Sequence, residues 1–328
     1  MKGKYRVIVQ DKRVRYDFTI HRNITVIRGD SATGKTTLLD MLTAYATAGA
    51  ESGTTVNCEK NCTVLTGMDW KNRLSGIHDS LVFMDELARF TASEDFAAAI
   101  RNTDNYYIIV SREPLANLPY SVDEIYGIRT SGKYGGLKQT YNEFYRIYGS
   151  RDSLVYQDPS LVIAEDSNSG YSFFRNIYDK KGISCVSANG KSNIHALLQK
   201  SAGTRILVIA DGADFGPEME RIHRLIESGH TIALYLPESF EWIILRSGLL
   251  KDSDINAILE SPEDYIESSL YFSWERFFTA LLVEKSQGSY LRYTRKTLNP
   301  VYLNDKERLA VSKVLSPLLD DDAAHSTR

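Results

Sequence analysis

This sequence has few cysteines, no long apolar runs and little net charge. The chain has three cysteines among 328 residues, too few for a disulfide framework. No apolar run approaches the length of a membrane span, and the opening MKGKYRVIVQ lacks the apolar core of a signal peptide. A net charge of −3 gives no overall attraction to nucleic acid or anionic lipid, so such contacts must be local. We therefore expect a cytoplasmic protein with no membrane partner.

The remaining composition is that of a globular chain. Hydrophobic residues make up 43% and charged residues 25% of the sequence, and a chain this long can bury the cores of two domains. A polar stretch near residues 149–160 that holds Pro159 is the expected linker. We predict an α/β fold with three parts, which are residues 1–150, residues 151–260 and a helical region over 261–328 that ends in a disordered acidic tail.

The segment Ile24–Leu39 contains the strongest motif. A β-branched strand is followed by Gly29, four residues, Gly34, Lys35 and Thr36, which satisfies G-x-x-x-x-G-K-[ST] and leads into a helical pattern. The glycines permit the angles that turn successive N–H groups inward, and the helix N-terminus favours an anion. Lys35 is expected to reach the β- and γ-phosphates of a nucleotide, and Thr36 to bind Mg²⁺. The predicted nucleotide-binding residues of the loop are Gly29, Asp30, Ser31, Ala32, Thr33, Gly34, Lys35, Thr36 and Thr37.

A predicted hairpin precedes this loop. Residues 5–9 and 14–20 alternate with period two around a polar turn. A hairpin that leads into a phosphate loop resembles the beginning of ATP-binding-cassette and related ATPases. That resemblance makes Tyr5 or Tyr16 a candidate for stacking on adenine, although packing of either ring on its own sheet is the simpler interpretation. Residues 122–148 are expected to form a second, closing hairpin.

Two buried strands end in polar residues that suit nucleotide hydrolysis. The run Leu81–Met84 is followed by Asp85 and Glu86, which are expected to hold Mg²⁺ and to act as the general base toward water, respectively. The next apolar strand, residues 106–110, is followed by Ser111 and Arg112. Either of these resembles the group that senses the γ-phosphate in many hydrolytic P-loop ATPases. No guanine-reading Asn-Lys-x-Asp follows, so ATP is the expected nucleotide.

The two nearest cysteines lie between these motifs. Residues 54–66 are expected to form a tight hairpin that carries Cys58 and Cys62. Their spacing suits metal ligation, but Zn²⁺ needs four ligands, Cys185 is far along the chain, and His78 is the only further candidate nearby. Two strand cysteines are therefore the favoured interpretation.

The second half predicts a parallel sheet. Apolar strands at residues 161–164, 183–186, 205–210 and 231–235 alternate with helical patterns. Glu165 follows the first of these strands, and Asp211 and Asp214 follow the third. Carboxylates at neighbouring strand ends suit a Mg²⁺ site for phosphodiester chemistry. Glu238 or Glu241, after the fourth strand, is a further candidate.

Glu165 at a strand end, the later Gly190 and the strand that ends in Asp211 resemble the Toprim domain of topoisomerases, primases and OLD-family nucleases. The resemblance implies that Glu165 is a catalytic general acid or base and that Asp211 is a catalytic metal ligand. The second aspartate of the family motif falls on Ala213, and Asp214 comes one residue late. Both acids also have a simpler interpretation as helix N-caps.

The order of a P-loop domain before a Toprim-like domain resembles that of the OLD family of ATPase-nucleases. This implies an ATPase that uses ATP and Mg²⁺, with a nuclease or nucleic-acid-binding domain, in phage defence or a mobile element, and assembled as a homo-oligomer. DNA, RNA or a protein are the partners implied besides the nucleotide. A regulatory ATPase with an inactive, partner-binding Toprim-like domain is the alternative. A small-molecule kinase is disfavoured, because Glu86 suits the activation of water.

The C-terminal region interleaves aromatic and basic residues. Tyr290, Arg292, Tyr293, Arg295 and Lys296 form a pattern that suits stacking on bases and pairing with phosphates. A short charged helix face explains the same pattern more simply.

Overall fold

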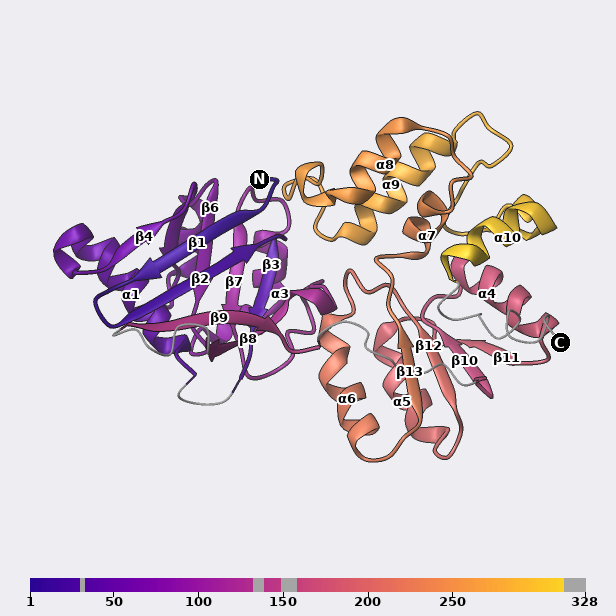
Figure 1. Ribbon diagram of the computed structural model, residues 1–328, viewed down its shortest axis with the longest axis horizontal. Coiled ribbons are helices and arrows are strands. Elements are labelled where there is room, and N and C mark those ends of the chain that lie inside the picture. Colours follow the sequence, from indigo (N-terminus) through magenta and orange to yellow (C-terminus); the bar gives the residue numbers. More distant parts are fainter. Residues whose placement is uncertain (30–32, 132–138, 149–157, 316–328) are drawn as a thin grey trace. The chain divides into compact units, whose positions relative to one another are not determined.

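The computed structural model, shown in Figure 1, describes residues 1–29, 33–131, 139–148 and 158–315. The chain divides into two units, of which the first comprises Met1–Ser150 with Ser261–Ser273 and the second Arg151–Glu260 with Trp274–Arg328. The first unit holds a nine-stranded sheet and the second a four-stranded parallel sheet, each with helices. The predicted mixed α/β architecture is therefore confirmed at this level. None of the helices in the described ranges is both long and apolar enough to cross a bilayer.

The large sheet combines a parallel and an antiparallel region. Its strands are β1 (Tyr5–Gln10), β2 (Val14–Ile20), β3 (Ile24–Ile27), β4 (Thr55–Asn57), β5 (Asn61–Val64), β6 (Ser80–Met84), β7 (Tyr106–Val110), β8 (Ile125–Thr130) and β9 (Thr140–Arg146), in the order β4-β1-β2-β9-β8-β3-β7-β6-β5. The run β8-β3-β7-β6-β5 is parallel. The pairs β1–β2 and β8–β9 are antiparallel, so both expected hairpins are confirmed.

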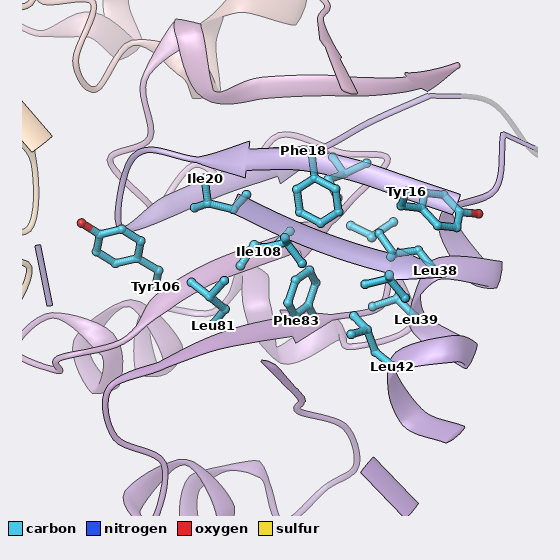
Figure 2. Packing of buried hydrophobic residues seen from close by; sticks show 14 of the residues in the cluster. Tyr16, Phe18, Ile20, Leu38, Leu39, Leu42, Leu81, Phe83, Tyr106 and Ile108 are labelled. Carbon is cyan, nitrogen blue, oxygen red and sulfur yellow. The ribbon is translucent and has the colours of Figure 1, made fainter. Parts of the chain in front are cut away.

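The first core lies between these two regions. The helix α1 (Lys35–Ala48) contributes Leu38, Leu39 and Leu42 to the core. Figure 2 shows these side chains and those of β2 meeting Leu81 and Phe83 of β6. Every residue of β3, β6 and β7 is buried, as expected for strands covered on both faces. The shorter helices of this unit are α2 (Trp70–Ser75) and α3 (Glu94–Ile100).

The expected hairpin over residues 54–66 is wrong. The strand β4 pairs antiparallel with β1, whereas β5 pairs parallel with β6 at the opposite edge of the sheet. Only residues 58–60 separate the two strands. The sheet is therefore curved enough for this short connection to join its two edge strands. Local alternation predicted two strands correctly, but it carried no information about their partners.

The second unit alternates strands and helices as predicted. Its sheet has the order β11-β10-β12-β13, and all pairs are parallel. The strands are β10 (Leu161–Ala164), β11 (Ser184–Ser187), β12 (Ile206–Ile209) and β13 (Ile232–Tyr235). The helices are α4 (Ser169–Lys180), α5 (Ile194–Lys200), α6 (Met219–Glu227), α7 (Phe240–Arg246), α8 (Ser253–Glu260), α9 (Trp274–Ser286) and α10 (Asp305–Val314).

The region expected over 261–328 is shared between the units. Ser261–Ser273 belongs to the first unit, where Gly3 N donates to Glu263 O at 2.6 Å and the amino terminus of Met1 pairs with Glu267. From Trp274 the chain belongs to the second unit, and α9 packs against α7. The expected acidic tail over 320–328 lies outside the described residues.

Candidate functional site

The candidate phosphate loop connects β3 to α1. Gly29 has φ of 129° and Gly34 has φ of 93°, both in the region that favours glycine. Lys35 is buried, and its Nζ donates to Gly29 O at 2.7 Å and to Thr33 Oγ1 at 3.0 Å. Thr36 and Thr37 are exposed in the first turn of α1. Of the predicted loop residues, Asp30, Ser31 and Ala32 lie outside the described part of the chain.

A buried tyrosine supports this loop from the antiparallel region. Tyr16 Oη donates to Gly34 O at 2.8 Å, and the side chains of Asn142 and Thr37 share hydrogen bonds with it. A Cβ on Gly34 would lie 2.7 Å from Tyr16 Oη, so the close approach requires glycine there. The ring of Tyr16 lies at one end of the core cluster in Figure 2. Tyr5 is buried as well, so the suggestion that either ring stacks on adenine is wrong.

An open pocket of about 670 Å³ lies beside the loop. Thr33, Gly34 and Thr37 line it on the loop side, and Arg13 and Arg129 are among the residues from β2, β8 and their flanks. Sequence reasoning missed Asn142 and Arg129 here. Their contribution depends on the pairing of β9 with β2, which joins segments that are far apart in the chain.

The predicted acids and the predicted sensor lie on neighbouring strands. β7 lies between β3 and β6, and Ser111 N donates to Ile27 O at 3.1 Å. Ser111 Oγ donates to Glu113 O at 2.7 Å. Asp85 and Glu86 follow β6 directly, and Asp85 Oδ1 accepts from Glu86 N at 2.7 Å. The groups therefore lie at the carboxyl ends of the parallel strands, as the phosphate loop does.

Glu86 is held in an ion pair. Arg112 Nε and Nη2 each donate to one oxygen of its carboxylate at 2.9 Å. The side chains are 28% exposed for Glu86 and 64% exposed for Arg112. A pair this exposed contributes little to stability, so a ligand can displace it at little cost.

The second unit brings two of its predicted acids together. Because β10 and β12 are neighbours, Glu165 Oε2 accepts from Asp211 N at 2.9 Å. Asp211 Oδ1 accepts from Phe240 N at 3.2 Å. Burial, reinforced by the charge of Asp214, raises the pKa of Glu165 to about 7. Burial, followed by the charge of Glu165, raises the pKa of Asp211 well above its ordinary value.

Asp214 has a cation of its own. Lys191 Nζ lies 2.9 Å from Asp214 Oδ2 and donates to Asp214 O at 2.7 Å. Oδ1 of Asp214 is buried and has no hydrogen-bond partner among the residues that the structure describes. A cavity of about 20 Å³ borders Glu165 and Asp211, which is room for about one water molecule. Within the described ranges, no three His, Cys, Asp or Glu side chains are grouped so that they could hold a metal ion.

Two further buried carboxylates extend this cluster. Glu241 of α7 accepts from Tyr293 Oη at 2.8 Å, and Glu275 of α9 lies 2.6 Å from Arg295 Nη2. Glu241 is one of the two further acids that the sequence suggested, whereas Glu275 was missed, because its helix was assigned to a separate region. The suggestion that Tyr293 and Arg295 contact nucleic acid is wrong for Tyr293, which is buried, and Arg295 is engaged by Glu275.

No protein-family model matches the chain, and no curated protein matches it. The functional argument therefore depends on the chemistry of these two sites. The first site offers a lysine, threonines and two carboxylates at one edge of a sheet. The second offers a compact group of buried acids with few compensating cations.

Proposed function

We propose that the first unit binds ATP with Mg²⁺ and hydrolyses it. The observation that supports this most directly is the topology of the large sheet. The strand order β3-β7-β6 places the phosphate loop, Ser111 and the pair Asp85–Glu86 side by side at the carboxyl ends of these parallel strands. A P-loop ATPase needs these groups together, because they bind the phosphates, sense the γ-phosphate and activate the attacking water, respectively. Ligands of α/β proteins bind outside the carboxyl ends of the strands, which is this edge.

Each residue then has a defined task. Gly29 O and Thr33 Oγ1, two of the acceptors of the Lys35 ammonium, are neutral oxygens, and phosphate oxygens are stronger, charged acceptors. Thr36 and Asp85 would hold Mg²⁺, which neutralises charge that develops on the phosphate oxygens. Glu86 acts as the general base toward water once it separates from Arg112. Arg112, freed from that pair, is then available to the γ-phosphate.

Loss of the lysine charge tests nucleotide binding. We expect Lys35→Ala to weaken the binding of a fluorescent ATP analogue with Mg²⁺ by on the order of 100-fold or more, because two charge-assisted hydrogen bonds are lost. Lys71→Ala is the matched control, since Lys71 is an exposed lysine of the same unit that pairs with Asp95. Binding that is equally strong in wild type and Lys35→Ala would refute the proposal.

For the second unit we infer a Toprim-like, metal-dependent nuclease or nucleic-acid-binding domain. Glu165 and Asp211 lie together at the ends of neighbouring parallel strands, and a buried oxygen of Asp214 lacks a described partner. Carboxylate oxygens are the ligands that Mg²⁺ or Mn²⁺ prefers, but no three described side chains are grouped closely enough to hold such an ion, so its binding would require these carboxylates to move closer together. A bound ion would activate a water or polarise a phosphodiester. The alternative, an inactive partner-binding module, is favoured by one observation. Lys191 already neutralises Asp214.

Metal-dependent stability distinguishes these two functions. In a Lys35→Ala background, which removes metal brought by nucleotide, we expect the melting temperature to rise with Mn²⁺ by mass action. Asp211→Asn should abolish the rise, whereas Asp179→Asn, at an exposed aspartate of α4, should preserve it. A melting temperature that does not respond to Mn²⁺ would establish the inactive module as the better proposal.

A further inference from the structure

Two thiols meet where the edges of the large sheet are joined. Cys58 directly follows β4, and Cys62 lies in β5, on the other side of the connection. Both thiols are free and partly exposed, and each contacts the backbone of Lys60. Lys60 N donates to Cys58 Sγ at 3.5 Å, and Cys62 Sγ lies 3.8 Å from Lys60 O. The backbone of Lys60 is therefore the shared hydrogen-bond partner of both sulfur atoms.

We propose that Cys58 and Cys62 are a peroxide-reactive dithiol, in which Cys58 attacks the oxidant and Cys62 closes a disulfide. The assignment of roles follows from the direction of the hydrogen bonds. Cys58 Sγ accepts from Lys60 N, which stabilises its negative form, whereas the Cys62 thiol donates to Lys60 O at 3.8 Å. Cys62 is the donor and stays protonated.

The electrostatic surroundings agree with these roles. The hydrogen bond from Cys62 lowers the pKa of Cys58 to about 7, with help from Lys60 N and against burial and the charge of Glu59. The same hydrogen bond, followed by burial, raises the pKa of Cys62 far above its ordinary value. The Lys60 ammonium lies 2.7 Å from Asp79 Oδ1. Cys185 is the contrast, because burial raises its pKa to about 12 and leaves it unreactive at neutral pH.

The proposed oxidation balances with hydrogen peroxide or an alkyl hydroperoxide as the oxidant. The Cys58 thiolate attacks one peroxide oxygen, the O–O bond breaks, and the leaving oxygen takes a proton to become water or an alcohol. Cys58 is then a sulfenic acid. The Cys62 sulfur attacks the Cys58 sulfur, the S–S bond forms, and the departing hydroxide takes the Cys62 proton and leaves as water. The sulfur pair loses two electrons and the peroxide gains them.

Peptide mapping of the full-length protein tests the proposal. After treatment with a small excess of hydrogen peroxide, we expect the unreduced peptide that spans Cys58 and Cys62 to lose the mass of two hydrogen atoms, reversibly with dithiothreitol. Cys185 should remain a free thiol and serves as the internal control. A protein in which Cys58 and Cys62 stay reduced while Cys185 oxidises would overturn the proposal.

Single substitutions then separate the two roles. In Cys62→Ser, the sulfenic acid on Cys58 has no thiol to react with, so dimedone should label Cys58. In Cys58→Ser, Cys62 should resist both dimedone and peroxide. Dimedone labelling of Cys62 in Cys58→Ser as strong as that of Cys58 in Cys62→Ser would overturn the assignment of roles. If a variant fails to fold, peptide mapping of the wild-type protein still shows whether the disulfide forms.

Discussion

The two candidate sites differ in how their charged groups are paired. In the first unit, Glu86 and Arg112 form an ion pair near the surface, and the buried Lys35 donates to neutral oxygens. In the second unit, Glu241 and Glu275 are only 3% and 6% exposed, and each has a specific partner inside the protein. Exposed pairs are easily exchanged for a ligand, whereas breaking a buried pair leaves an uncompensated group at high cost. The first site is therefore suited to cycles of binding and release, and the second to a fixed arrangement.

The largest effect should come from the exchangeable pair. We expect Glu86→Gln to lower the ATP hydrolysis rate about 10²–10⁴-fold, because the amide cannot take a proton from water. Nucleotide binding should survive, since the amide preserves the shape of the side chain. Steady-state hydrolysis and analogue binding measure the two effects separately. Hydrolysis within a few-fold of wild type would exclude Glu86 as the base and direct attention to Asp85.

A buried carboxyl group in the first unit tests whether fixed, buried acids are confined to the second unit. Glu124 is 1% exposed and accepts from Thr25 Oγ1 at 2.9 Å. Burial raises its pKa from 4.5 to about 7, against the opposing charge of Arg22. The folded state thus keeps a proton that the unfolded state releases, so the stabilisation is complete below pH 4.5 and is lost as the pH rises through about 7.

Glu124→Gln should remove that dependence. Between pH 4.5 and pH 7.5, we expect wild type to lose on the order of 3 kcal/mol of unfolding free energy relative to the variant. Urea unfolding at several pH values, with hydrogen exchange at β3 to identify the unit, measures the difference. Parallel pH profiles for the two proteins would show that Glu124 titrates alike in both states.

The next effect concerns the cluster of the second unit. Tyr293→Phe removes the hydroxyl that donates to Glu241, and the carboxylate is left buried without that donor. We expect a loss of about 1–3 kcal/mol in unfolding free energy. Tyr290→Phe is the matched control, because Tyr290 is 61% exposed and its hydroxyl lies 3.4 Å from Glu307. Equal stabilities of the two variants would mean that Glu241 finds another donor and that the cluster is less fixed than the geometry indicates.

Local pattern predicted the strands well and their partners poorly. The run Leu81–Met84 and the strands β10 and β12 were evident because buried parallel strands are short and apolar. The separation of β4 from β5 and the return of Ser261–Ser273 to the first unit depend on pairings between distant segments, which no local period records. The suggested nucleic-acid contact of Tyr293 was wrong for a related reason. Alternating aromatic and basic residues give the same sequence pattern whether they lie on a surface or contact a cluster of buried carboxylates.

Tyr16 gives the smallest and most discriminating test, because it connects the core of the first unit to its exchangeable site. Tyr16→Phe keeps the buried ring and removes only the hydroxyl that donates to Gly34 O. We expect a loss of about 0.5–1.5 kcal/mol in unfolding free energy. If the hydroxyl also holds the loop in its phosphate-binding form, ATP analogue binding should weaken by up to about tenfold, since the loop must then be ordered by the ligand.

Tyr5→Phe is the matched control, because Tyr5 is buried in the same sheet and its hydroxyl donates to Lys2 O, away from the loop. Weakened binding in Tyr16→Phe alone would show that the loop is preorganised by the fold. Unchanged binding in both variants would show that the loop takes its binding form only with the ligand, and the contrast with the fixed second site would be sharper still.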